Sequence, residues 1–370
     1  MATEKRARHA QARTLTHRVA HVRICASAFT LPTGCLLLFK ASLSKEPGML
    51  FNRTLMAAVL PMTLILGTAA CHADDGKAAA TPAKASTADA ARAVDALKAK
   101  TRAQLVQVKG GTFLMGDFGP QHNDEKLPYS GVTDDDVLRQ VTLDDYALQA
   151  RKVSYADFDV YTDAVGKPRV AQSRLDQPYR TLPDIAAGVS WPQAVAYCEW
   201  IGKQIGTPMT LPTEAQWEYA ARAGGRMWVY ATDTGTLDDG RNVSSIAQYD
   251  AFADMHGTRS RTSSLGAFPP NPLGLYDMAD HGYEWVADWY APEYDPAQTR
   301  NPRGPASGTE RVQRSSTDRA ADQLSITSMT FTRNHRVPEP GPMTDGEGNV
   351  VEGNPNPNGG NGFRCAGAAR

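Results

Sequence analysis

The segment VSWPQAVAYCEWIGKQIGTPMTLPTEAQWEYAARAGG, residues 189–225, carries the clearest local structure in the chain. Ser190 suits the N-cap of a helix, and Gly206 suits its C-terminal end, where a left-handed residue commonly stops a helix. Farther along, Thr213 and Gln216 form the T-x-x-Q pattern of a capping box, in which each side chain bonds the backbone N–H of the other residue. The segment therefore predicts two helices joined by a short connection.

The apolar residues of each helix fall on one face. Val195, Cys198 and Ile201 recur at helical spacing in the first helix, and Trp217 and Ala221 are four positions apart in the second. Such a stripe packs against the core of a globular domain. We therefore expect Cys198 and Trp217 to be buried.

Two carboxylates of the second helix invite a catalytic interpretation. Glu214 and Glu218 lie four residues apart, on one stripe of the helix. A structural explanation is favoured, because Glu214 lies beside the positive end of the helix dipole and Glu218 can pair with Arg222 at i+4. We interpret both glutamates as structural residues.

The flanking sequence predicts short strands and isolated helices. LVQVKGGTFLMGD, residues 105–117, has the pattern of two strands around a Gly-Gly turn, and residues 139–154 supply further short strands. A helix is expected over residues 155–165, with Phe158 and Tyr161 on one face. Long polar loops join these elements. The pattern predicts a single irregular α+β domain over residues 105–370.

The composition is that of a folded protein with no excess of either charge. The chain has 370 residues, of which 41% are hydrophobic, and a formal net charge of -1. This length and apolar content suffice for a sizeable core. The near-zero charge argues against a nucleic-acid partner, because binding to phosphates requires a basic surface.

Residues 49–71, MLFNRTLMAAVLPMTLILGTAAC, have the layout of an export signal. A short region with Arg53 precedes an apolar run, residues 55–66, that is too short to cross a bilayer comfortably. The small residues after this run end at Cys71 and resemble a bacterial lipoprotein cleavage box. We expect Cys71 to be lipidated; ordinary secretion, which needs the same small residues, is the alternative.

The residues before Met49 do not fit this layout. They contain eight basic residues against two acids, with no sustained apolar periodicity. A long basic lead is unusual ahead of an export signal. We therefore interpret Met49 as the start of the protein and residues 1–48 as upstream sequence read in frame.

Residues 72–104 connect the signal to the first predicted strand. Their first half is rich in Ala, Lys, Asp and Thr, which is typical of a tether. The Ala-rich second half predicts a helix capped by Ser86 or Thr87 and ending near Gln104. His72 follows the cysteine, so by the sorting habit of Gram-negative lipoproteins we expect a periplasmic protein anchored to the outer membrane through lipidated Cys71.

Five blocks of sequence carry a family resemblance. They are GGTFLMGD (110–117), the segment quoted above (189–225), AFPPNPLGLYDMADHGYEWVADWY (267–290), NPRGPASGTERV (301–312) and GFRCA (362–366). Together, and in this order, they resemble the sulfatase-modifying-factor superfamily, which contains the formylglycine-generating enzymes. The resemblance implies one domain with a C-type-lectin-like fold and little regular secondary structure, in agreement with the α+β pattern.

The resemblance to formylglycine-generating enzymes also implies an activity. Those enzymes hold Cu(I) between two closely spaced cysteines and convert a sulfatase cysteine to formylglycine, and the two cysteines follow an RGGS stretch. The matching region here, residues 311–338, contains no Cys, and its paired glycines are replaced by Ser315 and Ser316. Because Cu(I) prefers thiolate ligands, we expect neither copper nor copper-dependent formylglycine generation.

Calcium is a second cofactor that the resemblance implies. Family members often bind it through an Asn in an AN stretch and through a loop of sequence GNVWEW. Asn242 matches the first and Glu284 matches the glutamate of the second, but the loop is altered to DHGYEW, residues 280–285. The alteration removes the Asn oxygen, for which Asp280 is a partial substitute. Asn242 and Glu284 are therefore the candidate calcium ligands, with an ordinary capped turn as the alternative.

The resemblance further implies a disulfide between Cys198 and Cys365, because the blocks that contain them are disulfide-bonded in some family members.

Two other segments carry expectations of their own. Asp134 to Asp136 form a charge run of the kind found in solvated loops. The Gly- and Asn-rich residues 347–362 occupy the position where catalytic members close their substrate groove, and we expect a recognition loop there.

Two classes of function follow. We expect an exported binding or assembly module, built on an enzyme scaffold, that recognises an exported protein or peptide partner. The alternative is a periplasmic oxidoreductase, either of the branch that matures a siderophore chromophore or, less favoured, of the branch that converts a sulfatase cysteine. The missing cysteines and the altered loop favour the binding module, and no catalytic residue is assigned.

Overall fold

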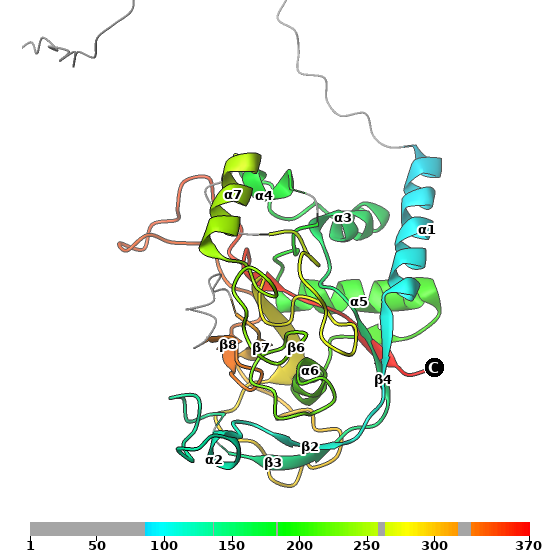
Figure 1. The fold of residues 1–370 in the computed structure, drawn as a ribbon. Helices are drawn as coiled ribbons and strands as arrows, with labels where there is room; N and C mark the ends of the chain where they lie inside the picture. Colours follow the sequence, from blue (N-terminus) through cyan, green and yellow to red (C-terminus); the bar gives the residue numbers. More distant parts are fainter. Residues whose placement is uncertain (1–85, 136, 183, 258–262, 317–326) are drawn as a thin grey trace, which may run out of the picture. The chain divides into compact units, whose positions relative to one another are not determined.

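The computed structural model describes residues 86–135, 137–182, 184–257, 263–316 and 327–370 (Figure 1). The predicted export signal, Cys71 and the first part of the tether lie outside these residues. The helices are α1 (Thr87–Ala103), α2 (Gly119–His122), α3 (Tyr155–Ala164), α4 (Gln177–Arg180), α5 (Trp191–Ile205), α6 (Glu214–Ala221) and α7 (Ile246–His256). The strands are β1 (Leu105–Val108), β2 (Thr112–Met115), β3 (Arg139–Thr142), β4 (Tyr146–Gln149), β5 (Met209–Thr210), β6 (Tyr283–Trp289), β7 (Arg311–Arg314), β8 (Asn334–Arg336), β9 (Asn361–Gly362) and β10 (Ala366–Ala368).

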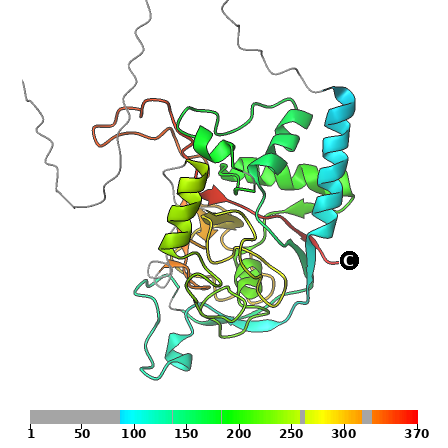
Figure 2. The same cartoon turned by 45° about the horizontal axis from the view of Figure 1, so that its top comes forward.

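These strands form small sheets. One has the order β1-β4-β10-β5, another pairs β2 with β3, and a third has the order β8-β7-β6-β9. Paired strands run antiparallel, apart from the parallel pair β6 and β9. The C-terminal segment, red in Figure 2, supplies β9 to the third sheet and β10 to the first. The end of the chain therefore links two sheets.

The helix ends follow the capping signals of the sequence. In α5, the backbone N–H of Ser190 donates to the side chain of Gln193 at 2.9 Å, and Gly206 ends the helix with a φ of 74°. In α6, Thr213 and Gln216 form both bonds of a capping box, at 2.9 and 3.2 Å. These helix ends are as predicted, because each depends on residues at most a few positions apart.

The two predicted strands around the Gly-Gly turn are present, but they do not pair with each other. β1 pairs with β4, whereas β2 pairs with β3. The turn passes close to another segment: a Cβ on Gly110 would lie 2.3 Å from the carbonyl oxygen of Leu143. Glycine at this position therefore allows two backbones to approach closely where the chain passes from one sheet to the next.

The first helix packs onto the folded body. α1 contacts α3 and α5, and it lies beside them in Figure 1. Leu97 is buried, and Lys100 pairs with Asp157 of α3 at 2.8 Å. Ser86 caps the helix, as predicted. Helix α1 is thus anchored by both apolar and ionic contacts.

The core surrounds α5 and α6. Phe158, Tyr161, Tyr197 and Phe363 pack as a group of edge-to-face and stacked rings beside α5. Trp217 of α6 is also buried, as its spacing predicts. No helix within the described residues is both long enough and apolar enough to cross a membrane.

Candidate functional site

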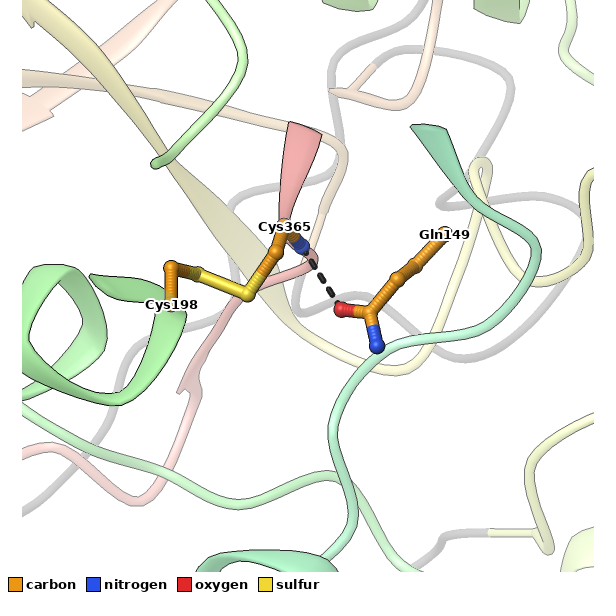
Figure 3. The surroundings of a disulfide bond; sticks show 3 residues. All are labelled: Gln149, Cys198 and Cys365. Carbon is orange, nitrogen blue, oxygen red and sulfur yellow. Dashed lines mark hydrogen bonds between the residues drawn. A yellow bond between two sulfur atoms is a disulfide. The ribbon is translucent and has the colours of Figure 1, made fainter. Parts of the chain in front are cut away.

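A disulfide joins the two cysteines of the domain. Cys198 of α5 and Cys365 have an S–S distance of 1.94 Å and Cα atoms 5.5 Å apart, and both residues are fully buried. The side-chain oxygen of Gln149 accepts a hydrogen bond of 2.8 Å from the backbone N–H of Cys365 (Figure 3). This is the pairing that the resemblance implied. It ties α5 to the segment leading into β10.

A chain of alternating charges runs beneath the surface from α6 to the residue before β8. Arg314 of β7 bonds Glu214 at 2.8 Å with one terminal nitrogen and Glu218 at 2.9 Å with the other. Arg222 pairs with Glu218 at 2.9 Å, and Arg333 pairs with Glu214 at 2.7 Å. All five residues are buried. Two carboxylates are thus held by three guanidinium groups.

This network agrees with a structural role for the glutamates. The predicted pair between Glu218 and Arg222 is present. Burial favours a raised pKa for Glu214, but the guanidinium groups of Arg333 and Arg314 outweigh it, so that the pKa of Glu214 lies below its usual range. A permanently ionised, fully bonded carboxylate is a poor proton carrier at neutral pH.

Sequence reasoning missed the central member of this network, Arg314. A signal for it exists in the strand that contains it, β7. Val312 and Arg314 are two positions apart on a strand and therefore face the same side, and both are fully buried. An arginine that shares a strand face with a core valine requires a buried anionic partner.

The expectation that Asp134 to Asp136 lie in a solvated loop is wrong for the two residues that the structure describes. Asp135 is fully buried and accepts a hydrogen bond of 2.7 Å from the hydroxyl of Ser130. Burial raises the pKa of Asp135 to about 7. Asp134 accepts a bond of 3.0 Å from the Tyr290 hydroxyl. Tyr290 is distant in sequence, so this contact could not be seen in the local charge pattern.

A pocket of about 360 Å³ opens beside this network. It lies at the end of β6 and against the segment 291–306. Asp288 is one of its lining residues and is 3% exposed. One carboxylate oxygen of Asp288 accepts a hydrogen bond of 2.7 Å from the backbone N–H of Glu214. Burial, followed by the charge of Glu214, raises the pKa of Asp288 to about 7.

The rim of the pocket is predominantly acidic. Glu293 and Asp295 are exposed residues of the lining, and with Glu214 and Asp288 they provide four carboxyl groups. The lining has two guanidinium groups, those of Arg139 and Arg333. The Arg139 guanidinium lies 3.9 Å from the ring centre of Tyr294, and Arg333 is held by Glu214. The remaining negative charge suits a cationic or protonated guest.

A larger pocket, of about 520 Å³, runs along β4, β5 and β10. Two of its ionisable lining residues already have partners: Asp144 pairs with Arg300, and Asp145 pairs with Lys109. Strand backbone and apolar side chains form most of the remaining wall. The pocket at Asp288 therefore brings more ionisable side chains together than this larger pocket does, and we take it as the candidate functional site.

Ser315 occupies one of the two positions where the family's RGGS stretch has glycine. It is 5% exposed and has a φ of 70°, in the left-handed region that glycine normally fills. Ser316 is also buried. The backbone therefore adopts a glycine-like conformation here even though the glycines are gone. Residues 317–326, which follow, lie outside the described chain.

The two candidate calcium ligands have separate sets of partners. The side-chain oxygen of Asn242 accepts a bond of 2.8 Å from the backbone N–H of Asp238, and its nitrogen donates to Asp233 and to the carbonyl oxygen of Thr236, both at 3.0 Å. Within the described part of the chain, no three His, Cys, Asp or Glu side chains are grouped as a metal site. The Asn242 oxygen is thus engaged in a turn.

Glu284 is also fully engaged. Arg364 bonds both of its carboxylate oxygens, at 2.7 and 2.8 Å, and the Lys152 ammonium lies 3.9 Å away. Burial lowers the pKa of Lys152 to about 8, an effect that Glu284 opposes. Two cations already face one carboxylate, so the surroundings of Glu284 do not fit an added divalent ion.

The low-complexity segment 347–362 consists of two parts. Its first residues are largely exposed, and Thr344 and Val350 form an isolated bridge at its base. Farther on, Asn356 is tied down by bonds to Asp176 at 3.0 Å and to the carbonyl oxygen of Gly188 at 2.7 Å. The recognition role of this loop stays a prediction.

The sequence is similar to a known protein family and to characterised members of it. Residues 90–334 match the family model described as a sulfatase-modifying factor enzyme 1-like domain. The chain is 28% identical over 256 residues to the formylglycine-generating enzyme of Mus musculus, covering 57% of this chain and 65% of that protein. It is 29% identical over 326 residues to the formylglycine-generating enzyme of Streptomyces coelicolor, covering 78% of this chain and 96% of that protein.

A solved structure resembles the fold. PvdO from Pseudomonas aeruginosa has a TM-score of 0.52 at 23% identity, covering 71% of this chain and 94% of that one. The domain is thus of the irregular α+β, C-type-lectin-like class. The chain belongs to the sulfatase-modifying-factor family. It spans a little under two thirds of the length of the mouse relative.

Proposed function

We propose that this family member is a periplasmic binding or assembly module without copper-dependent formylglycine generation. The observation that supports the proposal is the state of its thiols. Cys198 and Cys365 are joined in a buried disulfide, and the remaining cysteines of the sequence are Cys25, Cys35 and Cys71. A copper site of two closely spaced thiolates therefore has no ligands in the domain.

We also propose that the chain is exported and lipid-anchored through Cys71 to the outer membrane. A buried disulfide in the core is typical of an oxidising compartment, which supports export. Metabolic labelling with palmitate tests the anchor. Wild-type protein should incorporate label and fractionate with outer membranes, and Cys71→Ser should lose both properties. Unlabelled, soluble wild-type protein would instead indicate ordinary secretion.

The pocket at Asp288 is the proposed place of partner binding. Its lining includes the buried carboxyl group of Asp288 and the exposed residues Glu293 and Asp295. The Asp295 carboxylate accepts bonds from the backbone N–H of Ala297 at 2.9 Å and from the side chain of Gln298 at 3.3 Å. Both donors are neutral, so the negative charge of Asp295 can still attract a cationic group. Tyr294 and Trp289 provide aromatic walls. Aromatic rings and carboxylates together recognise lysine or arginine side chains. The expected partner is therefore an exported protein or peptide that presents a basic side chain.

A selection from a random peptide library tests this binding mode. Basic peptides should be enriched on the wild-type protein and lost on the double variant Glu293→Lys, Asp295→Lys. The control Asp254→Lys reverses an exposed charge on α7, away from the pocket lining, and should retain the enrichment. Recovery of the same peptides from both variants would contradict binding at this pocket.

One observation favours the oxidoreductase alternative. Asp288 has a pKa of about 7 and lies in a pocket wall, which suits a general acid or base near neutral pH. This alternative includes the siderophore-chromophore and sulfatase-cysteine chemistries. Metal analysis and oxygen uptake with a cysteine-containing sulfatase peptide distinguish the two classes. A stoichiometric redox metal with peptide-dependent uptake would identify an enzyme, and their absence would favour the binding module.

A further inference from the structure

Lys152 is a buried lysine that contacts residues 280–285, the loop that resembles the family's calcium-binding loop. Its ammonium donates to the carbonyl oxygen of Asp280 at 2.6 Å and to that of Gly282 at 2.7 Å, and it lies 3.9 Å from the carboxylate of Glu284. The Lys152 side chain is fully buried. Three oxygen atoms of residues 280–284 therefore converge on one positive charge.

The backbone of this loop is shaped to present those carbonyl groups. His281 and Gly282 are consecutive left-handed residues, with φ values of 66° and 88°. The turn that they form directs the carbonyls of Asp280 and Gly282 toward the same ammonium. Gly282 also lies against the turn before β9, because an added Cβ would be 2.7 Å from the carbonyl oxygen of Gly360. The loop conformation is therefore specific and costly to reach without compensation.

Backbone carbonyls and a carboxylate are also the ligands that a hard divalent cation takes. The ammonium group of a lysine is a compact charge with three donors, so it can satisfy the same oxygens. A calcium ion at this position would have to displace Lys152 from a buried site. It would also put a doubly charged ion, in place of a singly charged ammonium, beside Arg364, which already bonds Glu284.

We propose that the Lys152 ammonium is the built-in cation of the 280–284 loop and replaces a bound calcium ion there. The family resemblance pointed to Glu284 as a calcium ligand, and the residues around it point instead to an internal substitute. The loop then holds its conformation in the absence of metal. Its order depends on the lysine side chain and is independent of calcium concentration.

Hydrogen exchange of the loop amides and thermal melting, each with chelator or with calcium, test this substitution. In the wild-type protein, amides of residues 280–285 should exchange slowly in chelator and remain unchanged on addition of calcium. Lys152→Ala empties the cation position while it leaves the three oxygens in place. This variant should melt at a lower temperature in chelator and should recover part of the loss when calcium is added.

Two control variants separate charge from packing. Lys152→Met fills the space without a charge and should be destabilised with no response to calcium. Lys109→Ala removes an exposed lysine that pairs with Asp145 and should melt as the wild type does under both conditions.

A wild-type loop whose exchange slows on calcium addition would overturn the proposal, as would a folded Lys152→Ala protein that ignores calcium. If Lys152→Ala does not fold, the wild-type exchange experiment alone decides the question.

Discussion

Arg314 lies between two glutamates that are four residues apart on α6, and each of its terminal nitrogens bonds one of them. Arg222 also bonds Glu218, and Arg333 also bonds Glu214. Each glutamate thus has two guanidinium partners. Removal of one arginine takes a charged hydrogen bond from a buried carboxylate, which costs more than loss of a solvent-exposed ion pair.

Replacement of Arg314 should therefore be strongly destabilising. Arg314→Met is expected to lower the free energy of unfolding by about 3 to 5 kcal/mol, because Glu214 and Glu218 each lose a charged hydrogen bond in the interior, worth about 1.5 to 3 kcal/mol. Arg333 then remains on Glu214 and Arg222 on Glu218. Arg300→Met is the matched control, since Arg300 pairs with Asp144 at the surface and its loss should cost less than about 1 kcal/mol. Denaturant titration of both variants checks the difference. Equal losses would contradict the network's role.

Asp288 predicts a specific pH dependence. Its pKa of about 7 exceeds the ordinary value of 3.8, so the folded state holds this proton more tightly than the unfolded state does. The resulting stability is fully present below about pH 4 and is lost as the pH rises through 7. Charged groups that interact with it include Glu214, Arg333, Arg139 and Arg311.

Asp288→Asn keeps an oxygen that accepts the Glu214 N–H and removes the titration. Relative to wild type, the variant should therefore gain stability between pH 4 and pH 8, on the order of 2 to 4 kcal/mol. Asp145→Asn is the control: hydrogen bonds from Lys109 and Gly110 lower the pKa of Asp145 below 3.8, so this variant should differ from wild type by a constant amount over the same range. Thermal melting across this pH range measures both. A constant difference between Asp288→Asn and wild type would refute the assignment.

At the scale of elements, the disulfide joins α5 to the chain segment before β10. Its two cysteines are separated by 167 positions, so the bond restricts a long loop of the unfolded chain. In the chain-entropy model a loop of this length corresponds to about 5 kcal/mol of stabilisation. The bond also holds the terminal segment that links two sheets.

Loss of this bond should be costly and equal for either cysteine. Cys198→Ala, Cys365→Ala and the double variant should all lose about 5 kcal/mol or less in the free energy of unfolding, because each change removes the same cross-link. Denaturant titration without reductant measures it. Losses that add in the double variant would show that packing, and not the cross-link, is responsible.

The elements with local signals could be predicted from the sequence. Ser86, Ser190 and Thr213 cap their helices as expected, since a cap depends on neighbours within one turn. The strands around Gly110 were also predicted, but their pairing was not. Strand pairing is set by contacts between distant segments, which a single sequence does not display.

The candidate site was harder to predict, because it too depends on contacts between distant segments. Arg314 and Glu214 are separated by 100 positions, and Asp134 and Tyr290 by 156. The acidic run at Asp134 therefore resembles a surface loop until its partners are known. Asp288 likewise gives no signal of its raised pKa, because burial by the fold produces the shift.

The chain keeps the family fold and a disulfide that the family resemblance implies, whereas the region that matches the copper-binding cysteines contains no Cys. Residues 90–334 match the family model, and the two thiols within the domain form a disulfide. The glycine-like backbone at Ser315 persists beside a segment without cysteine. Retained architecture with altered chemistry is consistent with a scaffold that binds, because a fold does not by itself determine an activity.

Mass spectrometry of a sulfatase peptide shows directly whether this protein carries out copper-dependent formylglycine generation. Purified protein is incubated with Cu(I), oxygen and a peptide that contains the substrate cysteine. The formylglycine-generating enzyme of Streptomyces coelicolor serves as the positive control. We expect an unmodified cysteine in the peptide under conditions in which the control converts it. Conversion of that cysteine to formylglycine by this protein would show that it is a formylglycine-generating enzyme despite the missing cysteines.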